Sequence, residues 1–195
     1  MTELDKTIDD GSRLTVRVAT PECWADLATL WADTNGCDGC WCFNHHIEPG
    51  ADDVRGDEAR EAKRRYLAAG RAGGVLGYLD GLPVGWCAVD LARDIPGHDC
   101  VRQLDDASDE GVWFIHCFYV RPEARGRGVA RAMLLGTIEW LRRLGATRVE
   151  GFPSPPDEEP LFHAFGGPFG LYAEQGFVRV ATALGEGYCR VARAP

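Results

Sequence analysis

The chain has 195 residues, of which 45% are hydrophobic and 26% are charged, so it can bury one substantial core and is not a disordered chain. Its formal net charge of -9 argues against nucleic-acid and anionic-membrane partners, because both bind through Lys and Arg. The N-terminal residues are polar and acidic without an apolar run, so we expect no secretory signal and a reduced, cytoplasmic protein.

The first half of the chain predicts a short tail followed by strands, helices and a hairpin. Residues 1–13 are expected to form a flexible segment, and residues 14–195 a single domain. The helix expected after Thr20 has Pro21 at its first position, where proline is favoured. The elements expected here are a strand at 14–18, a helix from 21 to about 32, a loop over 35–52, a helix over 53–69 and a hairpin of strands at 75–79 and 84–89.

The second half begins with an acidic loop over 90–111 and continues with a strand. Residues 112–120 are almost wholly apolar, as expected for a strand that is covered on both faces. Residues 129–144 carry apolar side chains at helical spacing, and Gly145 is the stop signal. The last expected elements are a strand at 147–152, a short helix near 168–175 and strands near 177–182 and 187–193. This order predicts a single α+β domain.

A glycine-rich turn follows the strand at 112–120 and opens the next helix. The first N–H groups of a helix have no partner within it and carry a partial positive charge, so they attract an anion. Gly126 and Gly128 would let a phosphate approach the backbone, and Arg125 and Arg127 add fork-shaped donors. The turn predicts a small phosphorylated ligand, although a turn of this kind can also serve packing alone.

Two motifs in this order of elements resemble the GCN5-related N-acetyltransferase (GNAT) superfamily. Its acyl-CoA signature, Arg/Gln-x-x-Gly-x-Gly/Ala, is met by Arg125-Gly126-Arg127-Gly128-Val129-Ala130. Its later element, Leu-Tyr-x-x-x-Gly-Phe, is met by Leu171-Tyr172-Ala173-Glu174-Gln175-Gly176-Phe177. The resemblance runs from about residue 14 to 193 and implies the GNAT fold, a central mixed, mostly antiparallel twisted sheet flanked by helices. It also implies acetyl-CoA as the co-substrate.

The resemblance assigns site residues as well. Main-chain groups of Phe118 to Val120 would pair with the pantetheine arm, and the amides of the turn would hold the pyrophosphate. Tyr172 would protonate the departing CoA thiolate, and the alternative is a core aromatic that only packs. Many members carry an Asn before this Tyr, whereas residues 163–170 here contain none. The residues expected to bind acetyl-CoA are Phe118, Tyr119, Val120, Arg125, Gly126, Arg127, Gly128, Val129, Ala130 and Arg131.

The attacking amine must be neutral, so a base or a water chain should deprotonate it. Members of the family often use a Glu or His on the strand before the signature, which makes His116 the candidate, with Asp109 and Glu110 just before the strand. His116 shares strand parity with Phe118 unless a bulge, common here in the family, switches the face. A hydrogen-bonded structural histidine is the alternative. Nothing in the sequence indicates an activated Cys117, so we expect direct transfer.

The loop between the first two helices is rich in Cys and His, and it resembles the Cys-Trp-Cys loop of an uncharacterised subset of the family. In the GNAT layout this loop borders the acceptor site. The residues expected to line the acceptor pocket are Trp41, Phe43, His45 and His46. We interpret the cysteines as small buried apolar residues and expect no metal. The alternative is a metal–thiolate site with zinc-like spacing, whose ligands would be Cys37, Cys40, Cys42 and His45.

The function expected from the resemblance is transfer of an acetyl group from acetyl-CoA to an amine of a small molecule, by direct attack in a ternary complex. Acidic loops would attract a cationic metabolite or antibiotic, or would serve solubility alone. The alternatives are a sensor that holds acyl-CoA without turnover and a protein or peptide N-acetyltransferase. Dimers are common in the family, so a homodimer is also open.

Overall fold

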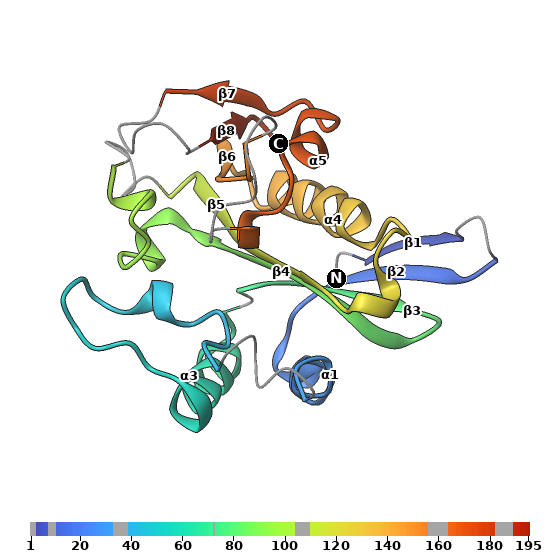
Figure 1. Ribbon diagram of the computed structural model, residues 1–195, viewed down its shortest axis with the longest axis horizontal. Helices are drawn as coiled ribbons and strands as arrows, with labels where there is room; N and C mark the ends of the chain where they lie inside the picture. Colours follow the sequence, from blue (N-terminus) through green and yellow to red (C-terminus); the bar gives the residue numbers. More distant parts are fainter. Residues whose placement is uncertain are drawn as a thin grey trace.

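The computed structural model of the chain describes residues 3–7, 11–32, 39–71, 73–103, 110–155, 164–181 and 189–195. These residues form one eight-stranded sheet with helices on both faces (Figure 1). Within the same ranges, no helix combines the length and the apolar composition needed to cross a bilayer.

The sheet is mixed and mostly antiparallel, as the sequence predicts. Its strands follow the order β1-β2-β3-β4-β5-β6-β8-β7, and only the β5–β6 pair is parallel. Antiparallel neighbours along the chain need only short turns, as between β3 and β4, whereas the parallel pair is joined through a helix. The strands are β1 (Glu3–Thr7), β2 (Arg13–Val18), β3 (Gly74–Leu79), β4 (Leu82–Leu91), β5 (Val112–Val120), β6 (Arg148–Gly151), β7 (Val178–Val180) and β8 (Arg190–Arg193).

The α-helices divide between the two faces of the sheet (Figure 1). Helices α1 (Trp24–Leu30) and α3 (Gly56–Ala68) cover one face, and α4 (Val129–Arg143) and α5 (Phe169–Ala173) cover the other. Each face has its own buried apolar cluster, which is what the helical periodicity of 129–144 predicts. The 3-10 turns are η1 (Pro21–Cys23), η2 (Asn44–His46), η3 (Ala92–Asp94), η4 (Val101–Gln103), η5 (Pro122–Ala124) and η6 (Ala164–Gly166).

The N-terminal segment departs from the expectation of a flexible tail. Residues 3–7 form β1, an edge strand that pairs antiparallel with β2 from Glu3 opposite Arg17 to Thr7 opposite Arg13. Leu4 packs against the core on the α4 face, so one apolar side chain in an otherwise polar segment fixes the strand to the sheet.

A β-bulge interrupts the pairing of β4 with β5. Ala88 pairs with Cys117 and the next residue, Val89, pairs with Ile115, so His116 has no partner in the register. The extra residue switches the face of the strand. Ile115 belongs to the core on the α4 face, while Cys117 packs in the α1–α3 cluster. The bulge that the family resemblance implied is therefore present.

Candidate functional site

The glycine-rich turn lies where β5 ends and α4 begins. After Val120 the chain makes the single turn η5, and Gly128 is the N-cap of α4 in the left-handed conformation, with φ of 78°. Gly126 also has a positive φ, 74°. A Cβ built on either glycine would meet no atom within 4 Å, so both face open space. The turn is thus an open backbone cradle whose amides can receive a phosphate.

The second half of β5 has an edge beside this cradle that no described strand covers. The parallel register with β6 ends at Ile115 opposite Gly151. From Phe118 to Val120, no described strand pairs with β5 on that side, although β4 still pairs on the other. An extended ligand can therefore add to this edge as a strand does, which is the arrangement expected for a pantetheine arm.

The arginines of the turn take different positions. Arg125 is exposed, and its Nε donates to the carbonyl oxygen of Val120 at 3.1 Å. The Nη2 of Arg127 donates to the hydroxyl of Ser12 at 2.7 Å, which directs this side chain toward the β1–β2 end of the sheet. Arg131 forms an exposed ion pair with Glu174 at 3.4 Å. The site therefore offers cationic groups at its rim, with Arg125 next to this edge of β5.

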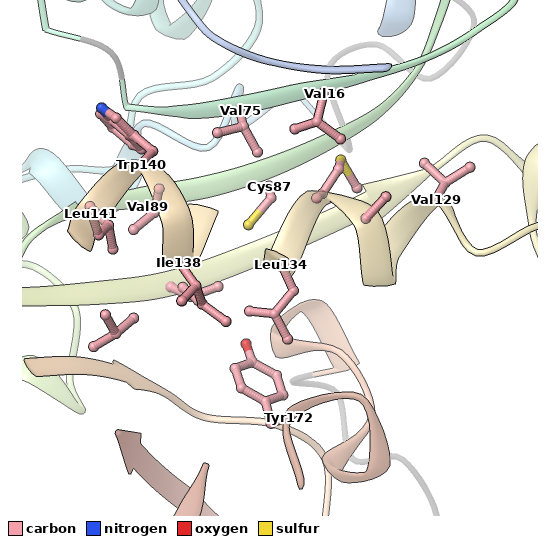
Figure 2. Close-up of a cluster of buried hydrophobic side chains, with 14 of the residues drawn as sticks. Val16, Val75, Cys87, Val89, Val129, Leu134, Ile138, Trp140, Leu141 and Tyr172 are labelled. Carbon is pink, nitrogen blue, oxygen red and sulfur yellow. The ribbon is translucent and has the colours of Figure 1, made fainter. Parts of the chain in front are cut away.

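Tyr172 lies in the core at the point where β5 and β6 separate. Its side chain is fully buried, and its hydroxyl donates to the carbonyl oxygen of Gly166 at 2.8 Å. Figure 2 shows the ring directed toward α4, with the hydroxyl on the side of Leu134. Gly151, the last residue of the β5–β6 register, leaves room for this ring, because a Cβ there would lie 2.8 Å from it. Burial raises the pKa of Tyr172 well above its ordinary value, so the phenol keeps its proton.

The second predicted catalytic residue, His116, lies on the opposite face of the sheet from Phe118. Its side chain is fully buried, and its Nε2 is 3.1 Å from Oδ2 of Asp90 on β4. Burial lowers the pKa of His116, and the neighbouring carboxylate opposes this shift. Burial by itself would raise the pKa of Asp90, but the contacts with His116 and His46, at 3.1 and 3.4 Å, outweigh it and hold that pKa below its usual range. Of the two acidic alternatives, Glu110 is an exposed partner of Arg93, and Asp109 lies outside the described residues.

The structure brings four histidines together around Asp90. The ring centroids of His45, His46 and His98 lie 5.1, 6.2 and 6.4 Å from that of His116. Burial, and then the charges of the neighbouring histidines, lower the pKa of His45 to about 2. The sequence predicts that His45 and His46 line an acceptor pocket, and the structure places both in this cluster with His116 and His98.

The other two predicted pocket residues are packed against aromatic rings. Trp41 is 5% exposed, stacks on Trp24 at 5.7 Å and meets Trp31 edge-on at 5.1 Å. Phe43 stacks on His46 at 5.0 Å. Trp41 therefore belongs to the core beneath α1, because its apolar ring is removed from water on all sides.

Among the described residues, no metal-ligating group of side chains joins Cys40 or Cys42 to His45. Cys42 is buried, and a hydrogen bond with Cys117, with burial, raises the pKa of Cys42 well above its ordinary value. A hydrogen bond with Cys42 and burial likewise raise the pKa of Cys40. Cys42 is thus a buried, weakly polar group, as the sequence predicts, whereas Cys40 is only half-buried. Cys37, the third member of the trio, lies outside the described residues.

No pattern in the sequence indicated the role of Asp90. It is the next-to-last residue of β4, at the start of a stretch interpreted as an acidic surface loop, yet it is 3% exposed. Its Oδ1 accepts a hydrogen bond from the hydroxyl of Tyr66 on α3 at 2.7 Å. In the structure, β4 continues two residues beyond the strand expected over 84–89. Asp90 therefore pairs with Phe114 and faces the same side of the sheet.

The model of the family described as "Acetyltransferase (GNAT) family" matches residues 30–165. No curated protein matches the chain. Among solved structures, yncA of Salmonella typhimurium with acetyl-CoA is similar to it, with a TM-score of 0.55, 15% identity and 93% of each chain covered.

Two further solved structures have the same fold. A GNAT-family acetyltransferase from Listeria monocytogenes has a TM-score of 0.62 at 15% identity and covers 98% of this chain and 100% of its own. A ribosomal-protein-alanine N-acetyltransferase from Brucella melitensis has a TM-score of 0.55 at 15% identity and covers 92% of this chain and 99% of its own. At such identities the likeness is one of fold.

Proposed function

The chain belongs to the acetyltransferase (GNAT) family, and from that premise we propose that it transfers an acetyl group from acetyl-CoA to the amine of a small molecule. The observation that carries the proposal is the open cradle at Gly126 and Gly128, directly beside the edge of β5 that no described strand covers. Pyrophosphate and pantetheine need these two features next to each other. The acetyl-CoA held by the Salmonella typhimurium structure supports the choice of co-substrate.

Acetyl transfer proceeds in our proposal by direct attack in a ternary complex. The amine nitrogen bonds to the acetyl carbon, the carbon–sulfur bond breaks, and the CoA sulfur leaves as a thiolate that needs a proton. Tyr172 supplies that proton and regains one from water. Two observations support this role: the phenol keeps its proton at neutral pH, and it lies where β5 and β6 separate.

The amine loses its proton to water rather than to His116. The buried imidazole of His116 faces Asp90 on the α1–α3 face, whereas Phe118, two residues on, packs on the α4 face. A base must come within hydrogen-bond reach of the proton that it removes, directly or through one water. The opposite orientation of these two side chains places His116 away from the edge assigned to pantetheine.

The acceptor is best tested with a panel of amines. Full-length protein is mixed with acetyl-CoA and small amines, aminoglycosides or basic peptides, and release of the CoA thiol is followed. We expect release above the acceptor-free rate with at least one small amine. Release with basic peptides alone would favour a peptide acceptor, the kind of substrate named for the Brucella melitensis protein. Acetyl-CoA binding without release in any class would overturn catalysis in favour of a sensor.

A further inference from the structure

Three side chains on the α1–α3 face, those of His46, Asp90 and His116, bring potential metal-ligating atoms close together. One nitrogen each of His46 and His116 and one carboxylate oxygen of Asp90 all lie within 4.8 Å of one another. The two histidine nitrogens are 3.4 and 3.1 Å from the carboxylate oxygen. In a tetrahedral zinc site with ligands at about 2.0–2.1 Å, neighbouring ligand atoms are about 3.3 Å apart. The two nitrogen–oxygen distances thus match those between neighbouring ligands of such a site.

The hydrogen bonds of His46 leave its inward-facing nitrogen available. The Nδ1 of His46 is 2.9 Å from the carbonyl oxygen of Asp94, which can only accept, so Nδ1 carries the proton. The Nε2 of His46 has no hydrogen-bond partner among the described residues, although the side chain is only 5% exposed. A cation between this nitrogen and the carboxylate oxygen of Asp90 would give the buried nitrogen a partner.

The outer atoms of His46 and Asp90 are held in the manner typical of metal sites. Metal-bound histidines usually donate their second N–H to a carbonyl, as His46 does, and metal-bound carboxylates are themselves hydrogen-bonded, as Asp90 is to Tyr66. The segment that carries His46 is fixed by Gly97. Its N–H donates to the carbonyl oxygen of His45 at 3.1 Å, and a Cβ on Gly97 would lie 2.5 Å from the carbonyl oxygen of Ile47. The site is therefore built on two strands and a supported turn.

From this geometry we propose that His46, Asp90 and His116 bind one divalent transition-metal ion of the zinc class. Two imidazoles and one carboxylate suit zinc, cobalt or iron(II), whereas magnesium and calcium prefer oxygen ligands throughout. This ligand set differs from the expectation of no metal and from the alternative set in the cysteine loop. The three ligands come from η2, from β4 and from the bulge in β5. The proposed metal site does not depend on the proposed acetyl transfer.

Cobalt titration of full-length untagged protein tests the site, because bound Co²⁺ absorbs visible light with an intensity that reports its coordination number. We expect one ion per chain with a low-symmetry, four- or five-coordinate spectrum, and Zn²⁺ should displace it. His46→Asn and Asp90→Asn should each weaken binding by about 100-fold or more, since each removes a ligand. The matched control is His45→Asn, which changes the adjacent histidine of the same cluster and should retain the spectrum.

Circular dichroism and acetyl-CoA binding show whether each variant is folded, and His46→Asn keeps the test valid if Asp90→Asn does not fold. Wild-type protein that is folded but binds neither cobalt nor zinc stoichiometrically would overturn the proposal. Equal binding by the wild type and by both ligand variants would do so as well. If Cys40→Ser and Cys42→Ser abolish binding while Asp90→Asn retains it, the metal belongs to the cysteine loop and the proposal is wrong.

Discussion

The hydroxyl of Tyr172 donates a hydrogen bond to the carbonyl oxygen of Gly166, 2.8 Å away, inside a fully buried pocket. Tyr172→Phe removes this bond and the proton that we assign to the leaving thiolate. We expect kcat to fall by about tenfold or more with little change in the KM for acetyl-CoA, together with a loss of about 1 kcal/mol in the free energy of unfolding. Unchanged kcat with the same loss of stability would assign Tyr172 to packing alone.

The pH dependence of kcat follows from the same burial. An acid acts in its protonated form, below its pKa, and burial places the pKa of Tyr172 well above its ordinary value of 10.0. Deprotonation of Tyr172 should therefore cause no loss of kcat between about pH 7 and pH 9. A decline of kcat in that range for the wild type, absent in Tyr172→Phe, would contradict this assignment.

Lys63 gives a test of charge near the proposed metal site. Its side chain is fully buried, with Nζ over the ring of Trp86 at 5.0 Å, and its charge acts on Asp90. Lys63→Met keeps most of the apolar volume and removes a positive charge that opposes a divalent cation. We expect cobalt affinity to rise, on the order of tenfold, in equilibrium dialysis. Weaker binding by a folded Lys63→Met protein would mean that the lysine does not face the site.

Glu150 gives a test of how the sheet is held beyond the site. This fully buried carboxylate on β6 accepts hydrogen bonds from Arg148 at 2.6 Å and from Arg190 on β8 at 2.7 and 2.8 Å. Glu150→Gln leaves two partly buried guanidinium groups without a counter-charge and should cost about 2–4 kcal/mol in urea unfolding. The control is Glu139→Gln, which breaks exposed pairs with arginines on α4 and should scarcely move the midpoint. Equal shifts of the urea midpoint for Glu150→Gln and Glu139→Gln would show that the buried carboxylate stabilises the sheet no more than an exposed one does.

The fold and the open glycine-rich turn could be predicted from the sequence because their signals are local. Helical periodicity over 129–144, the apolar run at 112–120 and the glycine-rich turn between them are each written in consecutive residues. Positive φ at Gly126 and Gly128 is likewise a property of single residues. These features depend on residues that are close together in the sequence, and not on contacts with distant segments.

The histidine cluster could not be predicted, because it depends on contacts between distant segments. His46 and Asp90 are far apart in the chain, and they meet only because Gly97 fits closely against the backbone of η2. The bulge that turns His116 toward Asp90 shows no residue pattern of its own in β5. The strand β1 was missed for a similar reason, since a single apolar residue, Leu4, anchors it.

Binding of acetyl-CoA at the turn before α4 is tested most sharply by a matched pair of glycine variants. Gly128 and Gly145 lie just beyond opposite ends of α4, have φ of 78° and 77°, and face open space. Alanine should strain both positions similarly, by about 1 kcal/mol, so both variants should lose similar stability. In a calorimetric titration with acetyl-CoA, we expect Gly128→Ala to raise Kd by about tenfold or more, and Gly145→Ala to bind as the wild type does. Equal Kd values for the two folded variants and the wild type would contradict binding at this turn.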